Sequence, residues 1–161
     1  MEAAAIGREE AGIRWTAAIW AGIIAGAVFL MLELVMVPVF LGESAWGPPR
    51  MIAAIALGQD VLPPPATFDL VIVLVAMMIH FVLSVLYALV LAWFVSRLGT
   101  GAAVATGAAY GLALYVVNFY LFTTVFPWFA MARNWVSIVA HILFGVIAAW
   151  AYKRLHRMRT A

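Results

Sequence analysis

Cysteine is absent from the 161-residue sequence, and charged residues make up only 10% of it. Without cysteine the chain forms no disulfide, no thiolate metal site, no iron–sulfur cluster and no covalently attached c-type haem. A soluble domain carries roughly 25% charged residues, so the low charge and the hydrophobic content of 68% predict an integral membrane protein. We expect the lipid bilayer to be its main partner, and we expect no nucleic-acid partner.

The motifs of common enzyme classes are also missing, namely G-x-S-x-G, the P-loop, G-x-G-x-x-G and H-E-x-x-H. Ser84 and Ser137 each lie four residues from a histidine, which is the spacing of ordinary contacts within one helix. We therefore expect no catalytic residue and no enzyme activity. No cofactor is the first expectation, and haem b or a divalent metal is the alternative.

Four long apolar segments are present, and each is close to or above the roughly 20 residues that cross a hydrocarbon core. They predict an all-α membrane protein, a four-transmembrane-helix bundle that forms a single domain over residues 1–161. The predicted spans cover approximately residues 15–41, 70–95, 102–125 and 135–152.

One connection, residues 42–69, is long and contains two proline clusters that interrupt helix. Between the clusters, residues 50–57 are apolar but too short to span a membrane. We predict a short half-helix there. It either lies at the membrane interface or re-enters the bundle as a lid over a site.

The basic residues predict the orientation of the chain. With four spans, seven of the nine Lys and Arg residues fall on the side of the two termini, and two fall on the side of the long loop. Basic residues concentrate on the cytoplasmic side, so the N and C termini are predicted to be cytoplasmic and the loop to be outside. The two outer basic residues are Arg50 and Arg133.

Each predicted span contains one polar side chain at depth. At about 1.5 Å per residue, Glu33, His80, Asn118 and His141 lie about 9 to 16 Å from the outer ends of their helices. We expect the four to converge in one polar cluster in the outer half of the bundle. Three further polar residues are expected to support it: Ser84, Tyr87 and Ser137.

Two glycine pairs with G-x3-G spacing indicate where helices pack closely. Gly22 and Gly26 share a helix face with Glu33, and Gly107 and Gly111 share one with Asn118. The repeated pattern raises the hypothesis of an internal duplication, in which Glu33 matches Asn118 and His80 matches His141.

The polar cluster has several interpretations that the sequence leaves open. The first interpretation is a structural role, with Glu33 bonded to a histidine and Asn118 bridging helices. The second is a metal site built from Glu33, His80 and His141, and the third is a haem b site between His80 and His141. The fourth is a proton or ion relay through Glu33 and a histidine, and the last is a binding site for a ligand that the sequence does not identify.

A resemblance to a known family is carried by three stretches: LVMVPVFLGESAWGPPRMIAAIALG, VLPPPATFDL and NFYLFTTVFPWFAMARNWVSIVAHILFG. They resemble a family of small four-span proteins of the bacterial inner membrane whose members are often labelled sodium:proline symporter. The resemblance covers nearly the whole chain after the first 15 residues and implies a multi-pass protein of the bacterial inner (cytoplasmic) membrane. No motif of the true sodium–solute symporters is matched, so no site residue is carried over.

For function, we expect an accessory or partner-binding membrane subunit with a buried polar cluster, working as a homo-oligomer or in a larger membrane complex. One alternative is a proton- or ion-coupled transporter of small solutes that works as an oligomer. The other is a haem- or metal-binding membrane protein.

Overall fold

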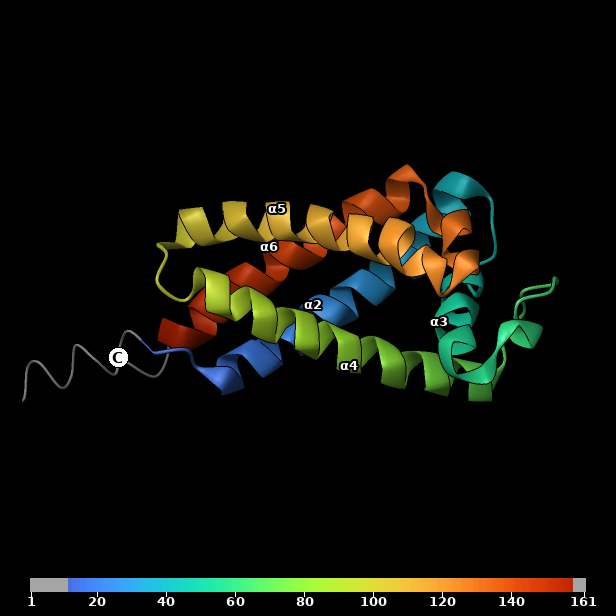
Figure 1. The fold of residues 1–161 in the computed structure, drawn as a ribbon, viewed down its shortest axis with the longest axis horizontal. Helices are drawn as coiled ribbons and strands as arrows, with labels where there is room; N and C mark the ends of the chain where they lie inside the picture. Colours follow the sequence, from blue (N-terminus) through green and yellow to red (C-terminus); the bar gives the residue numbers. More distant parts are fainter. Residues whose placement is uncertain (1–11, 158–161) are drawn as a thin grey trace, which may run out of the picture.

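The computed structural model describes residues 12–157, which form a bundle of long helices with no strand among them (Figure 1). Within this range, four helices are long and apolar enough to cross a membrane. The prediction of an all-helical, multi-pass membrane protein with four spans is therefore confirmed for these residues. The four spans are Trp15–Leu41, Leu70–Val95, Thr100–Thr124 and Trp135–Arg157.

The spans are built from regular helices that carry shorter irregular turns at one end of the bundle. The long helices are α2 (Trp15–Met36), α4 (Leu70–Val95), α5 (Thr100–Val116) and α6 (Trp135–Arg157). The short elements are η1 (Val37–Leu41), α3 (Gly47–Leu57), η2 (Gln59–Val61), η3 (Val117–Leu121), η4 (Phe122–Thr124) and η5 (Pro127–Ala132).

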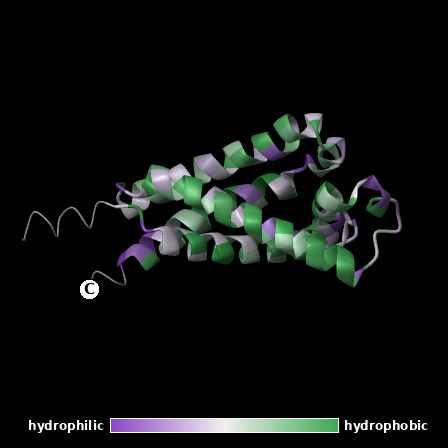
Figure 2. Ribbon diagram, turned by 60° about the horizontal axis from the view of Figure 1, so that its bottom comes forward, coloured by the Kyte–Doolittle hydropathy of each residue, from purple (hydrophilic) through white to green (hydrophobic). Residues whose placement is uncertain are grey.

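The short elements gather at one end of the bundle, which we call the α3 end, and the turn between α4 and α5 lies at the other (Figure 1). Hydrophobic residues cover the shafts of the long helices, and hydrophilic residues concentrate toward the two ends (Figure 2). Several tryptophans are exposed near helix ends, including Trp15, Trp93 and Trp135. This distribution is typical of helices whose shafts face lipid.

Two helices at the α3 end begin with a side-chain cap. The Asp69 carboxylate accepts a hydrogen bond from the Ile72 amide at 3.0 Å, and α4 follows. The Asn134 side-chain oxygen accepts one from the Ser137 amide at 3.0 Å, and α6 follows. Both caps satisfy amides that a helix start leaves unpaired.

The last turns of α2 and α5 differ from the continuous α-helices that we expected. Both spans widen into π-helix, as η1 and η3. In η1 the second residue is Pro38, which has no amide hydrogen to continue the α-helical pattern. In η3 the carbonyl of Phe119 accepts a bond from the Arg133 side chain at 2.7 Å. Such π-turns occur often at functional sites.

The fourth span is longer than predicted, because α6 continues through the basic residues to Arg157 instead of ending at 152. The Lys153 ammonium donates to the carbonyl of Ser96 at 3.1 Å, beyond the last residue of α4. A cation at the C-terminus of a helix stabilises its unpaired carbonyls. The third span begins at Thr100 instead of 102, directly after the turn.

Small side chains dominate the core and bring the helices close together. Most of its fully buried apolar residues are alanines, among them Ala18, Ala25, Ala140 and Ala149. Helix α6 packs along both α5 and α2, and α2 also packs along α4, whereas α4 and α5 have little contact. Small residues at helix contacts are the usual basis of packing in membranes, where lipid provides no hydrophobic driving force.

Candidate functional site

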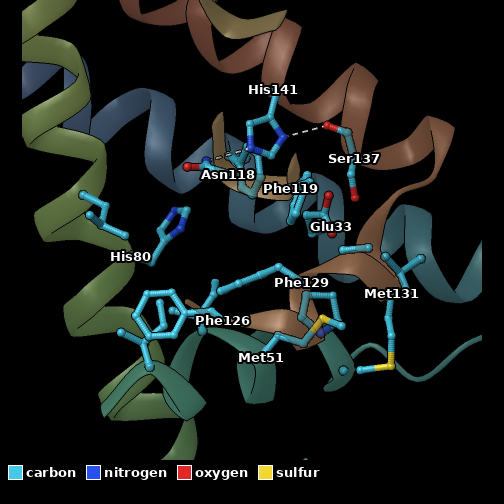
Figure 3. Close-up of a pocket in the computed structure, with 18 of the residues that line it drawn as sticks. Glu33, Met51, His80, Asn118, Phe119, Phe126, Phe129, Met131, Ser137 and His141 are labelled. Carbon is cyan, nitrogen blue, oxygen red and sulfur yellow. Dashed lines mark hydrogen bonds between the residues drawn. The ribbon is translucent and has the colours of Figure 1, made fainter. Parts of the chain in front are cut away.

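The α3 end of the bundle contains a partly open cavity of about 790 Å³ that is lined by residues of all four spans. Helix α3 and the segment from Phe126 to Ala132 cover it, and the Trp128 indole joins them by donating to the Met51 carbonyl at 3.0 Å. In Figure 3, Met51 and Phe129 lie on one side of the space, and Asn118 and His141 lie on the other.

All seven polar residues singled out in the sequence line this one cavity. The four expected cluster members come one from each span, and their three supporting residues lie beside them. The seven are Glu33, His80, Ser84, Tyr87, Asn118, Ser137 and His141.

Asn118 is the centre of a hydrogen-bond network that joins three helices. Its side-chain oxygen accepts from the Tyr87 hydroxyl of α4 at 2.8 Å, and its amide nitrogen lies 3.2 Å from Nε2 of His141. Nδ1 of His141 lies 2.7 Å from the Ser137 carbonyl. A carbonyl only accepts, so Nδ1 carries the proton and donates, and Nε2 accepts from Asn118. Both polar atoms of the Asn118 side chain and both ring nitrogens of His141 therefore have hydrogen-bond partners.

His80 is bonded through one ring nitrogen. Its Nε2 lies 2.9 Å from the Gly26 carbonyl, so this nitrogen carries the proton and donates. The Ser84 hydroxyl lies 3.4 Å from the same atom, which is at the long limit for a hydrogen bond. Among the described residues, no hydrogen bond reaches Nδ1 of His80. That nitrogen is an acceptor on a side chain that lines the cavity.

Glu33 is buried, with 6% of its surface exposed, and its Oε1 has no hydrogen-bond partner among the described residues. Its polar neighbour is Ser137 (Figure 3). The expected bond from Glu33 to a histidine is therefore wrong: His80 bonds to Gly26, and His141 bonds to Asn118 and Ser137. A buried carboxyl oxygen without a partner is costly, because it has lost its water and gained no donor.

The metal and haem alternatives do not fit the arrangement. No group of three His, Asp or Glu side chains within residues 12–157 is placed to hold a metal ion, so Glu33, His80 and His141 do not form a metal site. The Phe29 ring contacts both imidazoles, with centroid distances of 5.5 Å to His80 and 4.9 Å to His141. A haem b site between the two histidines needs a free nitrogen on each ring. Both nitrogens of His141 are already hydrogen-bonded, so His141 has no free nitrogen to bind an iron.

The four glycines lie where helix backbones approach each other below the cavity. A Cβ atom on Gly22 would lie 2.8 Å from the Ser84 carbonyl oxygen of α4, and one on Gly26 would lie 2.6 Å from the Ser84 hydroxyl. A Cβ on Gly107 or on Gly111 would overlap backbone carbonyls of α6. The bundle is therefore closely packed on the side of the cavity away from α3.

Several lining residues were not anticipated from the sequence. Phe126, Phe129 and Met131 belong to the connection between the third and fourth predicted spans, and Glu43 belongs to the long loop. The dense aromatic content of FPWFAMARN was the available signal. These aromatic residues line a cavity only because the segment folds over particular helices. The spacing of residues along the chain does not show which helices it covers.

The fold and the cavity together define a helical membrane protein with an internal, mostly apolar pocket. Comparisons with family models, with curated proteins and with solved structures find no match to this chain.

Proposed function

We propose that this protein is a non-enzymatic membrane protein that binds a small, largely apolar molecule in the cavity at its α3 end. The observation that carries the proposal is the cavity itself. Its volume of about 790 Å³ lies within the roughly 300–1,000 Å³ of small-molecule sites. Its lining surface is mostly apolar, and Phe, Ile, Met and Leu make up nearly half of the lining residues. Such a lining is also typical of small-molecule sites.

The polar groups favour binding over catalysis. Ser84 and Ser137 are the buried hydroxyl groups of the lining, and neither has a nucleophile–base–acid arrangement around it. His141 is fixed by Asn118 and by the Ser137 carbonyl, so it is not placed to exchange protons with a bound molecule. These groups orient a ligand and hold the helices.

The packing also favours binding over passage through the bundle. The cavity lining ends near Tyr87 and Phe144, and the helices beyond it meet at Gly22 and Gly107. Ion-coupled transport by an oligomer stays a prediction of the sequence. An accessory role in a homo-oligomer or a larger complex also stays a prediction, and ligand binding is what such a subunit would contribute.

The location of the chain belongs to the same proposal. The predominance of basic residues near the termini supports cytoplasmic termini, with the long loop and α3 on the outer side of a bacterial inner membrane. The cavity then lies near the outer face, at a depth that a molecule can reach from the outer leaflet.

The test is binding of tritiated 4-phenylbutanol to the protein in lipid nanodiscs, with empty nanodiscs as the background. We expect one saturable site per chain above that background. Ala132 lines the cavity and Ala130 is exposed outside it, so Ala132→Phe should abolish binding and Ala130→Phe should retain it. Equal uptake by protein-containing and empty discs, for this alcohol and for its amine and carboxylate analogues, would overturn the proposal.

A further inference from the structure

The charges around the cavity are of one sign. Among the described residues that line it, two are glutamates, Glu33 and Glu43, and none is Lys or Arg. The basic residues nearest in sequence are engaged elsewhere: Arg50 donates to the carbonyls of Val61 and Thr67, and Arg133 donates to that of Phe119. The described lining therefore offers no Lys or Arg side chain to an anion.

One oxygen of the deeper carboxyl group lacks a donor, although Ser137 is a hydrogen-bonding neighbour of that carboxyl. Glu33 is 6% exposed, lines the cavity, and has an Oε1 atom without a hydrogen bond among the described residues. It takes part in no ion pair with a described residue. A carboxylate removed from water is stabilised by a cation or by strong hydrogen-bond donors, so the missing partner is a group that brings a positive charge or a donated proton.

The second unpaired group in the cavity is also an acceptor. Because Nε2 of His80 donates to Gly26, Nδ1 of that ring is left to accept. A ligand head that carries N–H donors can pair with either of these acceptors, whereas a head that only accepts can pair with neither.

The remaining walls suit an organic cation with an apolar body. Seven aromatic side chains line the cavity: Phe29, Tyr87, Phe119, Phe122, Phe126, Phe129 and Phe144. Aromatic rings attract ammonium groups through their electron-rich faces, and they also bury hydrocarbon. We propose, resting on the binding function above, that the ligand is a lipophilic amine whose ammonium group pairs with the Glu33 carboxylate and whose apolar body fills the space beneath α3.

A matched series of head groups tests this proposal on the intact chain in nanodiscs. The probes are 4-phenylbutylamine, 4-phenylbutanol and 4-phenylbutyrate, which share one apolar body and carry an ammonium, a hydroxyl and a carboxylate. After subtraction of empty-disc binding, we expect the amine to bind about 10-fold or more tightly than the alcohol, as a charge-assisted hydrogen bond predicts. The carboxylate should bind most weakly.

One acidic residue inside the cavity and one outside it provide the variant and its control. Glu33→Gln keeps the size of the side chain and removes its charge, so the amine and the alcohol should then bind within about 3-fold of each other. Asp60→Asn removes an exposed carboxyl of η2 that does not line the cavity, and it should keep the preference for the amine. Elution volume and melting temperature show whether each variant is folded.

The outcomes separate the two proposals. If none of the three probes binds to the wild type, the binding function itself is wrong. If the alcohol binds as tightly as the amine, or if Glu33→Gln keeps the preference for the amine, the cavity binds small molecules but the assignment to amines is wrong.

Discussion

The helix pairs α2–α4 and α5–α6 are built on the same framework. In each pair, two glycines on the first helix face a histidine on the second and the small residue four positions after it. Gly26 lies against His80 and Ser84, and Gly111 lies against the backbone of His141. This match is what the hypothesis of an internal duplication predicts. It does not extend to the whole bundle, because the extensive α2–α6 contact has no counterpart between α4 and α5.

The two pairs differ in what happens to their polar side chains. In α5–α6, Asn118 and His141 bond to each other, and the network continues to Tyr87 and to the Ser137 carbonyl. In α2–α4, the carboxyl of Glu33 has an oxygen without a partner, and His80 uses one of its nitrogens. One pair therefore joins its polar side chains into a network, whereas the other leaves one carboxyl oxygen and one imidazole nitrogen without a hydrogen bond among the described residues.

The pairs also differ in how tightly they meet. Gly111 faces the backbone of α6, with Cα of Ile142 2.9 Å from the position of its Cβ, whereas Gly26 faces mainly the side chain of Ser84. A side chain can move aside or be removed by mutation, and a helix backbone cannot. The comparison leads to three predictions about stability.

The largest effect is expected for Gly111→Ala. The added methyl overlaps the His141 carbonyl, so α5 must move away from α6, at a cost of about 3 kcal/mol or more, at the upper end for overpacking. Gly26→Ala should cost about 1 kcal/mol, because the Ser84 side chain can yield. Unfolding in a titration of denaturing detergent measures both.

A second substitution sharpens that prediction. Ser84→Gly removes the atoms that a Cβ on Gly26 would meet first, so it should restore the stability of Gly26→Ala. No side-chain substitution on α6 removes the carbonyl of His141, and Gly111→Ala should have no such rescue. Equal losses for the two glycine variants would mean that the pairs do not differ in packing.

An intermediate effect is expected for Asn118→Ala. It leaves the Tyr87 hydroxyl and Nε2 of His141 without their partners, which costs about 1–2 kcal/mol. In a double-mutant cycle with Tyr87→Phe, the coupling energy should be close to the value of about 0.6 kcal/mol that is typical of membrane hydrogen bonds. Additive losses in the cycle would contradict the direct bond between Tyr87 and Asn118.

The spans and their buried polar residues were predictable because both depend on local pattern. Apolar length defines a span, and a spacing of three or four residues places Glu33 on the face of Gly22 and Gly26. These rules act within one helix. They are sufficient to indicate that the polar side chains of four spans turn toward a common interior, which is where Glu33, His80, Asn118 and His141 line one cavity.

The pairing of those side chains was not predictable in the same way. A bond between Glu33 and a histidine was the simplest expectation from charge, yet His80 bonds to the Gly26 backbone and Phe29 packs against both imidazoles. Which groups meet depends on helix rotation and on the π-turns η1 and η3, which shift the last residues of two spans. The cover formed by α3 and Phe126 to Ala132 depends on contacts between segments far apart in sequence.

The smallest effect is expected for Glu33→Gln, the variant that most directly separates the two helix pairs. If the carboxyl is available for a ligand and has no structural bond through Oε1, then its replacement by an amide of the same size should change stability by no more than about 0.5 kcal/mol, as for substitutions that break no packed or bonded feature. The measurement is the same detergent titration as for the glycine variants, on protein without added amine. A loss as large as that of Asn118→Ala would show that Glu33 is also part of the structural network, and the distinction between the two pairs would then be wrong.

A ligand-binding carboxylate predicts a different combination for Glu33→Gln: a stability close to that of the wild type and a lost preference for 4-phenylbutylamine. A residue with a structural role would instead lower the stability of the folded protein when it is replaced.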